Sequence, residues 1–244
     1  MKTVLITGAA SGIGLECAKQ IATLGHKVIS FDIKVCPLSE VKSYIVDVRK
    51  SEQIKKATIE LGGVDVLVSC AGVYNQAPIS EVLNSDVNPL VDVNLKGNLL
   101  VCQAILPLLR KAKGNIVIVS SGIGVNVDPL SPVYCATKAG LNMLIKCLAN
   151  TEPQNGVRVN GVLPGPIDTP LLNEWFNSEE EKQAYANCVP LKKVGSTYNV
   201  AQAVLFLTGL GGLDASYVNG ALLSVDGGES VSSALINTSK PNKN

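Results

Sequence analysis

The chain has 244 residues, of which 46% are hydrophobic and 17% are charged, and 21 Lys and Arg residues nearly balance 20 Asp and Glu residues to a formal net charge of +1. This length and apolar fraction favour one compact domain with a deep core. The small net charge and the aromatic content of 4% argue against a nucleic-acid partner, which would need a basic surface or base-stacking side chains.

The first predicted elements form a strand–loop–helix–strand unit. A short apolar run at 3–6 leads into a glycine-rich stretch at 8–14. Apolar residues then recur at helical spacing over 13–24, and a β-branched run follows at 27–31. The apolar start is too short for a signal-peptide core or a membrane span, so we expect a cytoplasmic protein with no membrane partner.

The same alternation continues along the chain. Buried strands are predicted at 64–69, 115–120, 157–163 and 221–225, and helices at 51–61, 89–111, 133–150 and 199–209. Asn88 and Pro89 are typical of a helix start, with Asn as the N-cap and Pro as the first helical residue. Strands alternating with helices predict an α/β fold: a doubly wound parallel sheet in three layers (α/β/α). We expect one domain at 1–229 and a flexible tail at 230–244, which is rich in Ser, Asn and Lys.

The Cys and His residues give no sign of a metal site. The seven Cys residues are scattered, odd in number and without a C-x-x-C pair, so neither a zinc site nor a disulfide framework is expected. The single His, His26, follows Gly25 in a predicted surface turn. A Ser-His-Asp triad is therefore not expected.

The glycine-rich stretch is typical of a dinucleotide-binding loop in a Rossmann-like fold. It reads Thr7-Gly8-Ala9-Ala10-Ser11-Gly12-Ile13-Gly14. Glycines here allow a sharp turn, close approach of a pyrophosphate and tight packing of the following helix. Asp32 follows the second strand, where an acid binds ribose hydroxyls and repels a 2′-phosphate. No basic residue occupies positions 9–11, so we expect NAD rather than NADP, with Lys34 as the nearest cation that would favour NADP.

Tyr134 and Lys138 are four residues apart on a predicted helix, so their side chains share one face. A nearby ammonium favours the phenolate and lowers the pKa of a Tyr from its usual value of about 10, which suits a general acid or base. The same spacing also occurs by chance on ordinary helix surfaces. Ser121, thirteen residues before Tyr134, follows a predicted strand at the carboxyl edge of the sheet, where open parallel sheets bind ligands.

With these motifs in this order, the chain resembles the short-chain dehydrogenase/reductase family from residue 3 to residue 228. The resemblance rests on Thr7-Gly8-x-x-x-Gly12-x-Gly14, Asn94 in Val93-Asn94-Leu95-Lys96-Gly97, Ser121, Tyr134-x-x-x-Lys138 and Pro164-Gly165. It implies that Tyr134 passes a proton to or from the substrate oxygen and that Ser121 hydrogen-bonds that oxygen. Lys138 would bind the nicotinamide ribose and lower the pKa of Tyr134, while Asn94 would hold a water between Lys138 and solvent. Ser120 lies one residue off the family spacing and is interpreted as structural.

The resemblance also implies a cofactor-binding set. Asp47 and Val48 would lie beside the adenine, Ala71 and Gly72 under the adenosine side, and a segment from Pro164 onward at the nicotinamide carboxamide. The full expected set is Gly8, Ser11, Gly12, Ile13, Gly14, Asp32, Asp47, Val48, Ala71, Gly72, Tyr134, Lys138, Pro164, Gly165, Ile167 and Thr169. The segment 221–228 resembles the family's last strand, which often packs in a tetramer interface, so we expect a homotetramer or homodimer.

Two departures from the family pattern stand out. Cys70 replaces an Asn that braces the central strand, which indicates altered bracing by a small hydrophobic side chain. Cys70 and Cys135 fall inside family motifs, so thiol reagents are expected to reach the site. The fourteen residues between Asp32 and Asp47 are too few for the usual helix plus strand, a variation that resembles NAD-dependent members acting on ring alcohols, such as hydroxysteroid and dihydrodiol dehydrogenases.

The substrate side is predicted to be apolar. The candidate lining residues are Val73, Tyr74, Ile123, Val125, Val127, Leu171, Leu172, Trp175 and Phe176. The resemblance implies that 171–190 forms a mobile lid, although the same side chains also suit simple core packing. We expect an NAD(H)-dependent oxidoreductase that interconverts a secondary alcohol and a ketone, with a small apolar or cyclic substrate. The alternatives are an NADPH-dependent 3-oxoacyl-(acyl-carrier-protein) reductase and a dinucleotide-sensing module without catalysis.

Overall fold

The computed structural model describes residues 1–174, 176 and 178–232. Its centre is a parallel sheet of seven strands in the order β3-β2-β1-β4-β5-β6-β9. The strands are β1 (Thr3–Thr7), β2 (Lys27–Asp32), β3 (Lys42–Ile45), β4 (Val66–Ser69), β5 (Asn115–Val119), β6 (Arg158–Pro164) and β9 (Leu222–Val225). The inner strands are almost entirely apolar and buried, as expected of a parallel sheet that is covered on both faces.

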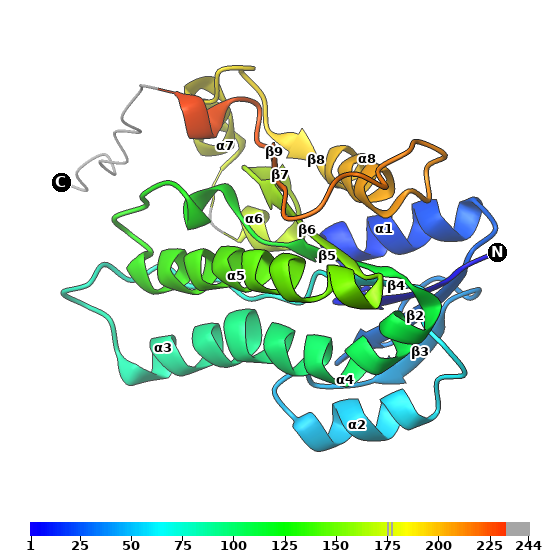
Figure 1. The fold of residues 1–244 in the computed structure, drawn as a ribbon. Coiled ribbons are helices and arrows are strands. Elements are labelled where there is room, and N and C mark those ends of the chain that lie inside the picture. The colour runs from blue at the N-terminus through cyan, green and yellow to red at the C-terminus, as the bar shows by residue number, and fades with distance from the viewer. Residues whose placement is uncertain (175, 177, 233–244) are drawn as a thin grey trace, which may run out of the picture.

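Helices cover both faces of this sheet (Figure 1). On one face lie α1 (Gly12–Thr23) and α8 (Thr197–Thr208), which pack against each other. On the other lie α2 (Ser51–Ile59), α4 (Asn98–Ala112) and α5 (Pro132–Thr151). Each interface has its own apolar core, one centred on side chains such as Leu5 and Ile116, the other on Ile6 and Val117. The predicted three-layer α/β/α domain is therefore confirmed.

The strands after β1 are added first on one side of it, as β2 and β3, and then on the other, beginning with β4. Thr7 at the end of β1 pairs in register with Phe31 of β2 on one side and with Ser69 of β4 on the other. The loops after these three strands therefore leave the sheet at one point of its carboxyl edge. In open α/β sheets such a point is where ligands bind.

The predicted helix start at Asn88 and Pro89 is wrong. Helix α3 (Asn84–Leu90) begins five residues before Pro89, because the Asp86 carboxylate accepts the backbone N–H of Leu83 at 2.9 Å and caps that turn. Pro89 lies inside α3. A π-helical segment, η1 (Val91–Gly97), then joins α3 to α4. The predicted single helix is thus three consecutive segments, and π-helical turns often occur at functional sites.

The short stretch between Asp32 and Asp47 forms strand β3 and no helix, in keeping with its length. The remaining short elements are η2 (Gly122–Gly124), η3 (Pro153–Asn155), β7 (Ile167–Asp168), α6 (Pro170–Asn173), α7 (Glu179–Cys188), β8 (Gly195–Ser196) and η4 (Glu229–Val231). Strands β7 and β8 pair with each other as a separate small sheet. Of the expected tail at 230–244, the structure describes residues 230–232, which begin within η4.

Candidate active site

The glycine-rich loop between β1 and α1 is folded tightly against its neighbours. Gly8 has a φ of 71°, and a Cβ atom there would lie 2.9 Å from the backbone of Ala71. A Cβ atom on Gly14 would lie 2.1 Å from the carbonyl oxygen of Gly8. The loop therefore excludes side chains at both positions. It leaves an exposed main chain in front of the N-terminus of α1, which suits a pyrophosphate group.

Asp32 at the end of β2 is tied to this loop. Its carboxylate accepts the backbone N–H of Ala10 at 2.9 Å and that of Lys34 at 3.0 Å. Gly8 donates its own N–H to the carbonyl of Phe31 at 3.0 Å. These bonds hold a negative charge beside the loop, where the sequence predicted the adenosine ribose.

The other residues predicted for the adenosine side lie after β3 and β4. Asp47 forms an ion pair with Arg49 at 2.7 Å, and this guanidinium lowers the pKa of the carboxyl group. Val48 is buried against Gly97, where an added Cβ atom would come within 2.8 Å of its side chain. Ala71 donates its N–H to the hydroxyl of Thr7 at 3.1 Å. Asp47 and Val48 after β3, and Ala71 after β4, therefore lie along the edge of the sheet that carries the glycine-rich loop.

The predicted nicotinamide segment continues this edge on the far side of β5. Pro164 ends β6, and Gly165 packs so closely on Asp226 that an added Cβ atom would lie 2.7 Å from it. Ile167 is buried in β7. The Thr169 hydroxyl accepts the N–H of Leu172 at 3.2 Å and caps α6. Its methyl group lies 3.7 Å from where a Cβ atom of Gly12 would be, so this segment and the glycine-rich loop face each other.

Ser11 and Ile13 flank Gly12, with Ser11 extended and exposed at the N-cap of α1. These residues fit a nicotinamide dinucleotide, because glycines line the cradle that such a group would fill.

The predicted catalytic side chains converge where β5 ends against α5. Tyr134 and Lys138 are 9% and 4% exposed, with Lys138 Nζ 5.5 Å from the centre of the Tyr134 ring. Ser121 lies near the Tyr134 hydroxyl and lowers its pKa. The Ser120 hydroxyl instead donates to the backbone carbonyl of Lys138 at 3.3 Å. Ser121 and not Ser120 therefore faces the Tyr hydroxyl, in keeping with the sequence interpretation.

The expected electrostatic effect of Lys138 on Tyr134 is wrong for this structure. Burial raises the pKa of Tyr134 to about 12, opposed by the hydrogen bond from Ser121. Burial also lowers the pKa of Lys138 to about 8, and its Nζ donates to the Val119 carbonyl at 3.3 Å. Removal of both groups from water penalises both charges, which raises the pKa of Tyr134 and lowers that of Lys138. The Tyr-x-x-x-Lys spacing indicated that Tyr134 and Lys138 lie together. It did not indicate their burial, which raises the pKa of Tyr134 where a lower value was expected.

Asn94 lies in the π-helical segment and is completely buried. Its amide pairs with both backbone groups of Val73: Oδ1 accepts the N–H and Nδ2 donates to the carbonyl, each at 2.8 Å. A Cβ atom on the adjacent Gly72 would lie 3.4 Å from Asn94 Oδ1 and 3.8 Å from Lys138 Nζ. Asn94 and Lys138 therefore meet around Gly72, at the end of the predicted adenosine-side segment.

A buried chain of polar side chains links this point to the glycine-rich loop, and sequence reasoning missed it. The hydroxyls of Thr7 and Ser69 lie 3.2 Å apart, Ser69 donates to Asn98 Oδ1 at 2.6 Å, and Asn98 Nδ2 donates to the Asn94 carbonyl at 2.8 Å. The Thr7 hydroxyl also accepts the N–H of Cys70 at 3.1 Å. Thr7, Ser69 and Asn98 thus brace the strand ends beside Cys70. The available signal was the polar residue that ends each of two buried apolar runs.

The substrate side combines aromatic, aliphatic and polar side chains. The Tyr74 ring meets the Tyr134 ring edge-on at 4.8 Å, and Val125 and Val127 are 56% and 88% exposed. Phe176 packs on Tyr185 at 5.6 Å between ring centres. The hydroxyl of Tyr185 donates to Glu229 at 3.0 Å, a pairing that sequence reasoning missed because 44 residues separate the two. Trp175 lies outside the described residues.

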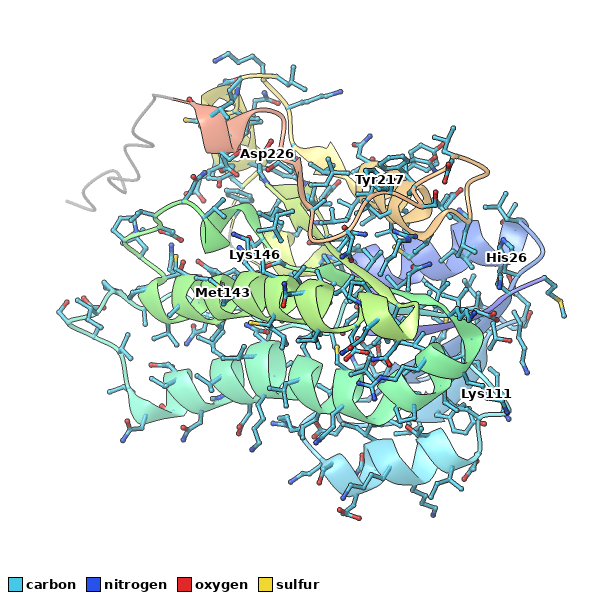
Figure 2. All side chains as sticks on the ribbon, in the orientation of Figure 1. His26, Lys111, Met143, Lys146, Tyr217 and Asp226 are labelled. Carbon is cyan, nitrogen blue, oxygen red and sulfur yellow. The ribbon has the colours of Figure 1, made fainter. Side chains whose placement is uncertain are left out.

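Features that would indicate other chemistry lie elsewhere. His26 sits before β2 at the amino edge of the sheet, where its Nδ1 accepts the N–H of Lys2 at 3.2 Å. Figure 2 shows it at the right-hand end of the molecule, away from Asp226, which follows β9. Among the described residues there is no group of three or more His, Cys, Asp and Glu side chains that could hold a metal ion. Within the same residues, no helix has both the length and the hydropathy of a membrane span.

Comparison with known proteins agrees with this geometry. Residues 2–180 match the model of the short chain dehydrogenases. The chain belongs to the short-chain dehydrogenase/reductase family. It is therefore an oxidoreductase of the family that binds a nicotinamide dinucleotide.

Similar proteins span nearly the whole chain. A 3-oxoacyl-(acyl-carrier-protein) reductase of Thermotoga maritima is 34% identical over an alignment that covers 93% of this chain and 97% of the relative. A glucose 1-dehydrogenase of Gluconobacter oxydans is 31% identical, with 93% and 91% covered. The ligand-free structure of Thermoplasma acidophilum aldohexose dehydrogenase superposes with a TM-score of 0.88 at 28% identity, covering 96% of each chain.

Proposed function

We propose that the protein is an NAD(H)-dependent oxidoreductase that interconverts a secondary alcohol and a ketone, with a small apolar or cyclic substrate such as a hydroxysteroid-like or dihydrodiol-like alcohol. The observation that carries this proposal is that Ser121 acts on the Tyr134 hydroxyl and lowers its pKa, while Lys138 Nζ lies 5.5 Å from the centre of the same ring. The two hydroxyls offer one oxygen atom two donors at the carboxyl edge of the sheet. That arrangement suits a carbonyl or carbinol oxygen on which charge develops.

In this mechanism the protein orients the substrate oxygen and moves one proton. A bound nicotinamide dinucleotide supplies the hydride acceptor or donor. Ser121 donates a hydrogen bond to the substrate oxygen, and Tyr134 Oη gives or takes the proton. Because burial raises the pKa of Tyr134 to about 12, Tyr134 is protonated at neutral pH and is ready to act as the acid in ketone reduction. Alcohol oxidation requires the phenolate and is favoured at higher pH.

Lys138 and Asn94 are proposed to support this proton transfer. The pKa of Lys138 is lowered to about 8, so its Nζ exchanges protons readily near neutral pH. Asn94 holds the Val73 backbone beside it, which keeps the region around Gly72 open. We propose that Lys138 binds the nicotinamide ribose and that Asn94 positions a water that connects Lys138 to solvent.

Asp32 supports NAD over NADP. Its carboxylate lies beside the glycine-rich loop, and a 2′-phosphate bound there would be repelled. No side chain at positions 9–11 carries a compensating positive charge. Lys34 follows Asp32 by two residues and is the nearest cation that favours the phosphorylated cofactor.

A second candidate is the NADPH-dependent reduction of a 3-oxoacyl thioester on an acyl carrier. It is favoured by the name of the Thermotoga maritima relative, at 34% identity over nearly the full length. The acid at position 32 counts against it. A non-catalytic dinucleotide-sensing module is less favoured, because Asn94, Ser121, Tyr134 and Lys138 are all present.

We further propose that residues 1–229 form the catalytic domain and 230–244 a flexible tail. A cytoplasmic homotetramer or homodimer remains the proposed assembly. Segment 171–190, which contains α6 and α7, is proposed as the lid over the substrate.

Steady-state oxidation of a panel of cyclic secondary alcohols with NAD and with NADP tests the proposal. We expect turnover with NAD and a kcat/KM at least about tenfold lower with NADP. Titration of NADPH fluorescence distinguishes the second candidate. Tight NADPH binding that displaces NADH, together with reduction of a 3-oxoacyl thioester, would contradict the preferred function.

A further inference from the structure

The segment after β9 directs a carboxylate toward the proposed active site. Gly227 and Gly228 adopt φ values of 64° and 89°, which turn the chain sharply. Asp226 accepts the N–H groups of Gly228 and Ser230 at 2.9 Å each and fixes the turn. Glu229 begins η4 inside this turn, so the backbone sets the direction of its side chain.

The Glu229 carboxylate lies between the two backbone stretches that flank the proposed reaction centre. A Cβ atom added to Gly165 would be 3.0 Å from its Oε2, and one added to Gly122 would be 3.9 Å away. Gly122 follows Ser121, and Gly165 belongs to the proposed nicotinamide segment. The absence of a Cβ atom at Gly165 lets Oε2 approach this backbone closely, near the residue that follows Ser121.

The two carboxylate oxygens have different surroundings. Oε1 accepts the hydroxyl of Tyr185 at 3.0 Å, which orients the carboxylate. Oε2 faces Gly122 and Gly165. Burial raises the pKa of Glu229, and the charges of Asp226 and Asp128 raise it further. No ion pair of Glu229 with a Lys or Arg is found in the part of the chain that the structure describes.

Other acidic and hydroxyl groups on this side are already engaged. Asp128 accepts the hydroxyl of Ser131 and the N–H of Leu130. Asp226 accepts two backbone N–H groups. The acceptor that faces the reaction centre is therefore a half-buried oxygen of Glu229. A hydrogen-bond donor on the substrate would stabilise this oxygen. An apolar chain or an anion would remove water from it without replacing the hydrogen bond.

We propose that Glu229, oriented by Tyr185, recognises a second hydroxyl group next to the reacting carbinol, so that the substrate is a cyclic diol or a polyhydroxylated compound. This inference rests on the proposed alcohol oxidation at Tyr134 and names its substrate class. A neutral hydroxyl group of the substrate can donate to Oε2 without bringing a further charge into this side of the site, where Tyr185 already contributes a hydroxyl group. The acyl thioester of an acyl carrier has no such donor beside its ketone.

The test compares matched alcohols that differ by one hydroxyl. Purified full-length wild type, Glu229→Gln, Glu229→Leu and Tyr185→Phe are assayed with NAD on cis-1,2-cyclohexanediol and on cyclohexanol. We expect wild type to prefer the diol, and both Glu229 variants to lose about 10- to 100-fold in kcat/KM on the diol while the value for cyclohexanol changes less than about twofold. The loss on the diol should lie mainly in KM, because the hydrogen bond positions the substrate and leaves Tyr134 intact. Tyr185→Phe should show a smaller loss of the same kind.

Controls keep the result interpretable. Glu60→Gln changes an exposed acid at the end of α2 and should leave the activity on both substrates unaffected. Thermal unfolding and NADH binding of the Glu229 variants should match wild type, which excludes misfolding as the cause of any loss. Equal losses on both alcohols, or none, would overturn the role of Glu229 and leave the alcohol oxidation intact. A preference for 2-aminocyclohexanol over the diol would overturn hydroxyl recognition. Failure of wild type on every alcohol and ketone would overturn the proposed function itself.

Discussion

The two halves of the site are built in different ways. The proposed cofactor half is built mainly from the main chain of the glycine-rich loop. Two side-chain groups hold it, the Asp32 carboxylate at the loop and the Thr7 hydroxyl at the backbone after β4. The substrate half consists of side chains from segments far apart in sequence, such as Tyr74, Tyr185 and Glu229. A tight backbone turn accepts only a few residue types, such as glycine. A contact between side chains can be made by many different residue types. We therefore expect cofactor binding and substrate selection to respond to different mutations.

Substitution of Tyr134 should separate the halves most sharply. Tyr134→Phe removes the proposed proton donor, so we expect kcat to fall by roughly a thousandfold or more. Dissociation constants for NADH, measured by fluorescence, should stay within about threefold of wild type. Tyr217→Phe, which changes a fully exposed residue, is the control. Unchanged activity of Tyr134→Phe would disprove the assignment.

The pH dependence should differ between the two directions of reaction. With a pKa of about 12, the fraction of Tyr134 present as phenolate increases tenfold per pH unit below that value. The pKa of Lys138, about 8, means that loss of its charge in the same range partly opposes phenolate formation. We expect kcat for oxidation to rise about 30-fold from pH 7 to pH 9, while kcat for reduction, which needs the phenol, stays level up to pH 8. A level oxidation profile over this range contradicts the raised pKa.

A change in the loop should damage the cofactor half alone. Gly14→Ala places a methyl group 2.1 Å from the Gly8 carbonyl oxygen, so the loop or α1 must shift. We expect NADH to bind about 20-fold more weakly and the free energy of unfolding to fall by about 2 kcal/mol. Gly62→Ala is the matched control, since a Cβ atom there meets nothing within 4 Å. Cofactor affinity and denaturant unfolding are the measurements, and wild-type values for Gly14→Ala would show that the loop is not constrained as described.

The smallest expected effect concerns cofactor choice. Asp32→Asn removes the charge proposed to repel a 2′-phosphate while keeping an acceptor for the Ala10 N–H. We expect the ratio of kcat/KM for NAD to that for NADP to fall by about tenfold, with the preference among alcohols unchanged. Asp214→Asn, at an exposed position, is the control. An unchanged ratio would remove Asp32 as the source of selectivity.

The backbone of the glycine-rich loop and the order of the elements were predictable from sequence because each depends on local patterns. Alternating apolar strands and amphipathic helices predicted the three-layer fold, which was confirmed. The loop glycines predicted where side chains are excluded, and Gly8 and Gly14 have the close contacts that this requires. The start of α3 was missed because Asn88-Pro89 is a typical cap, whereas Asp86 provides a stronger one to the preceding turn.

The remaining features depend on tertiary contacts. The pKa of Tyr134 follows from its burial, which a Tyr-x-x-x-Lys spacing does not report. The hydrogen-bonded chain through Ser69 and Asn98 joins residues 29 positions apart, and the Tyr185–Glu229 pair spans 44. No local pattern connects such residues. Sequence patterns therefore indicated which side chains lie together better than how burial shifts their pKa values.

Transfer of deuterium from a substrate carbinol carbon tests the central claim most directly. Wild type and Tyr134→Phe are incubated with NAD, or with NADP, and with cis-1,2-cyclohexanediol deuterated at its carbinol carbons, and the dinucleotide is analysed by mass spectrometry. We predict that wild type produces NADH carrying one deuterium, that NADP is labelled much less, and that Tyr134→Phe labels neither. No deuterium in either dinucleotide, or equal labelling by Tyr134→Phe and wild type, would contradict the account.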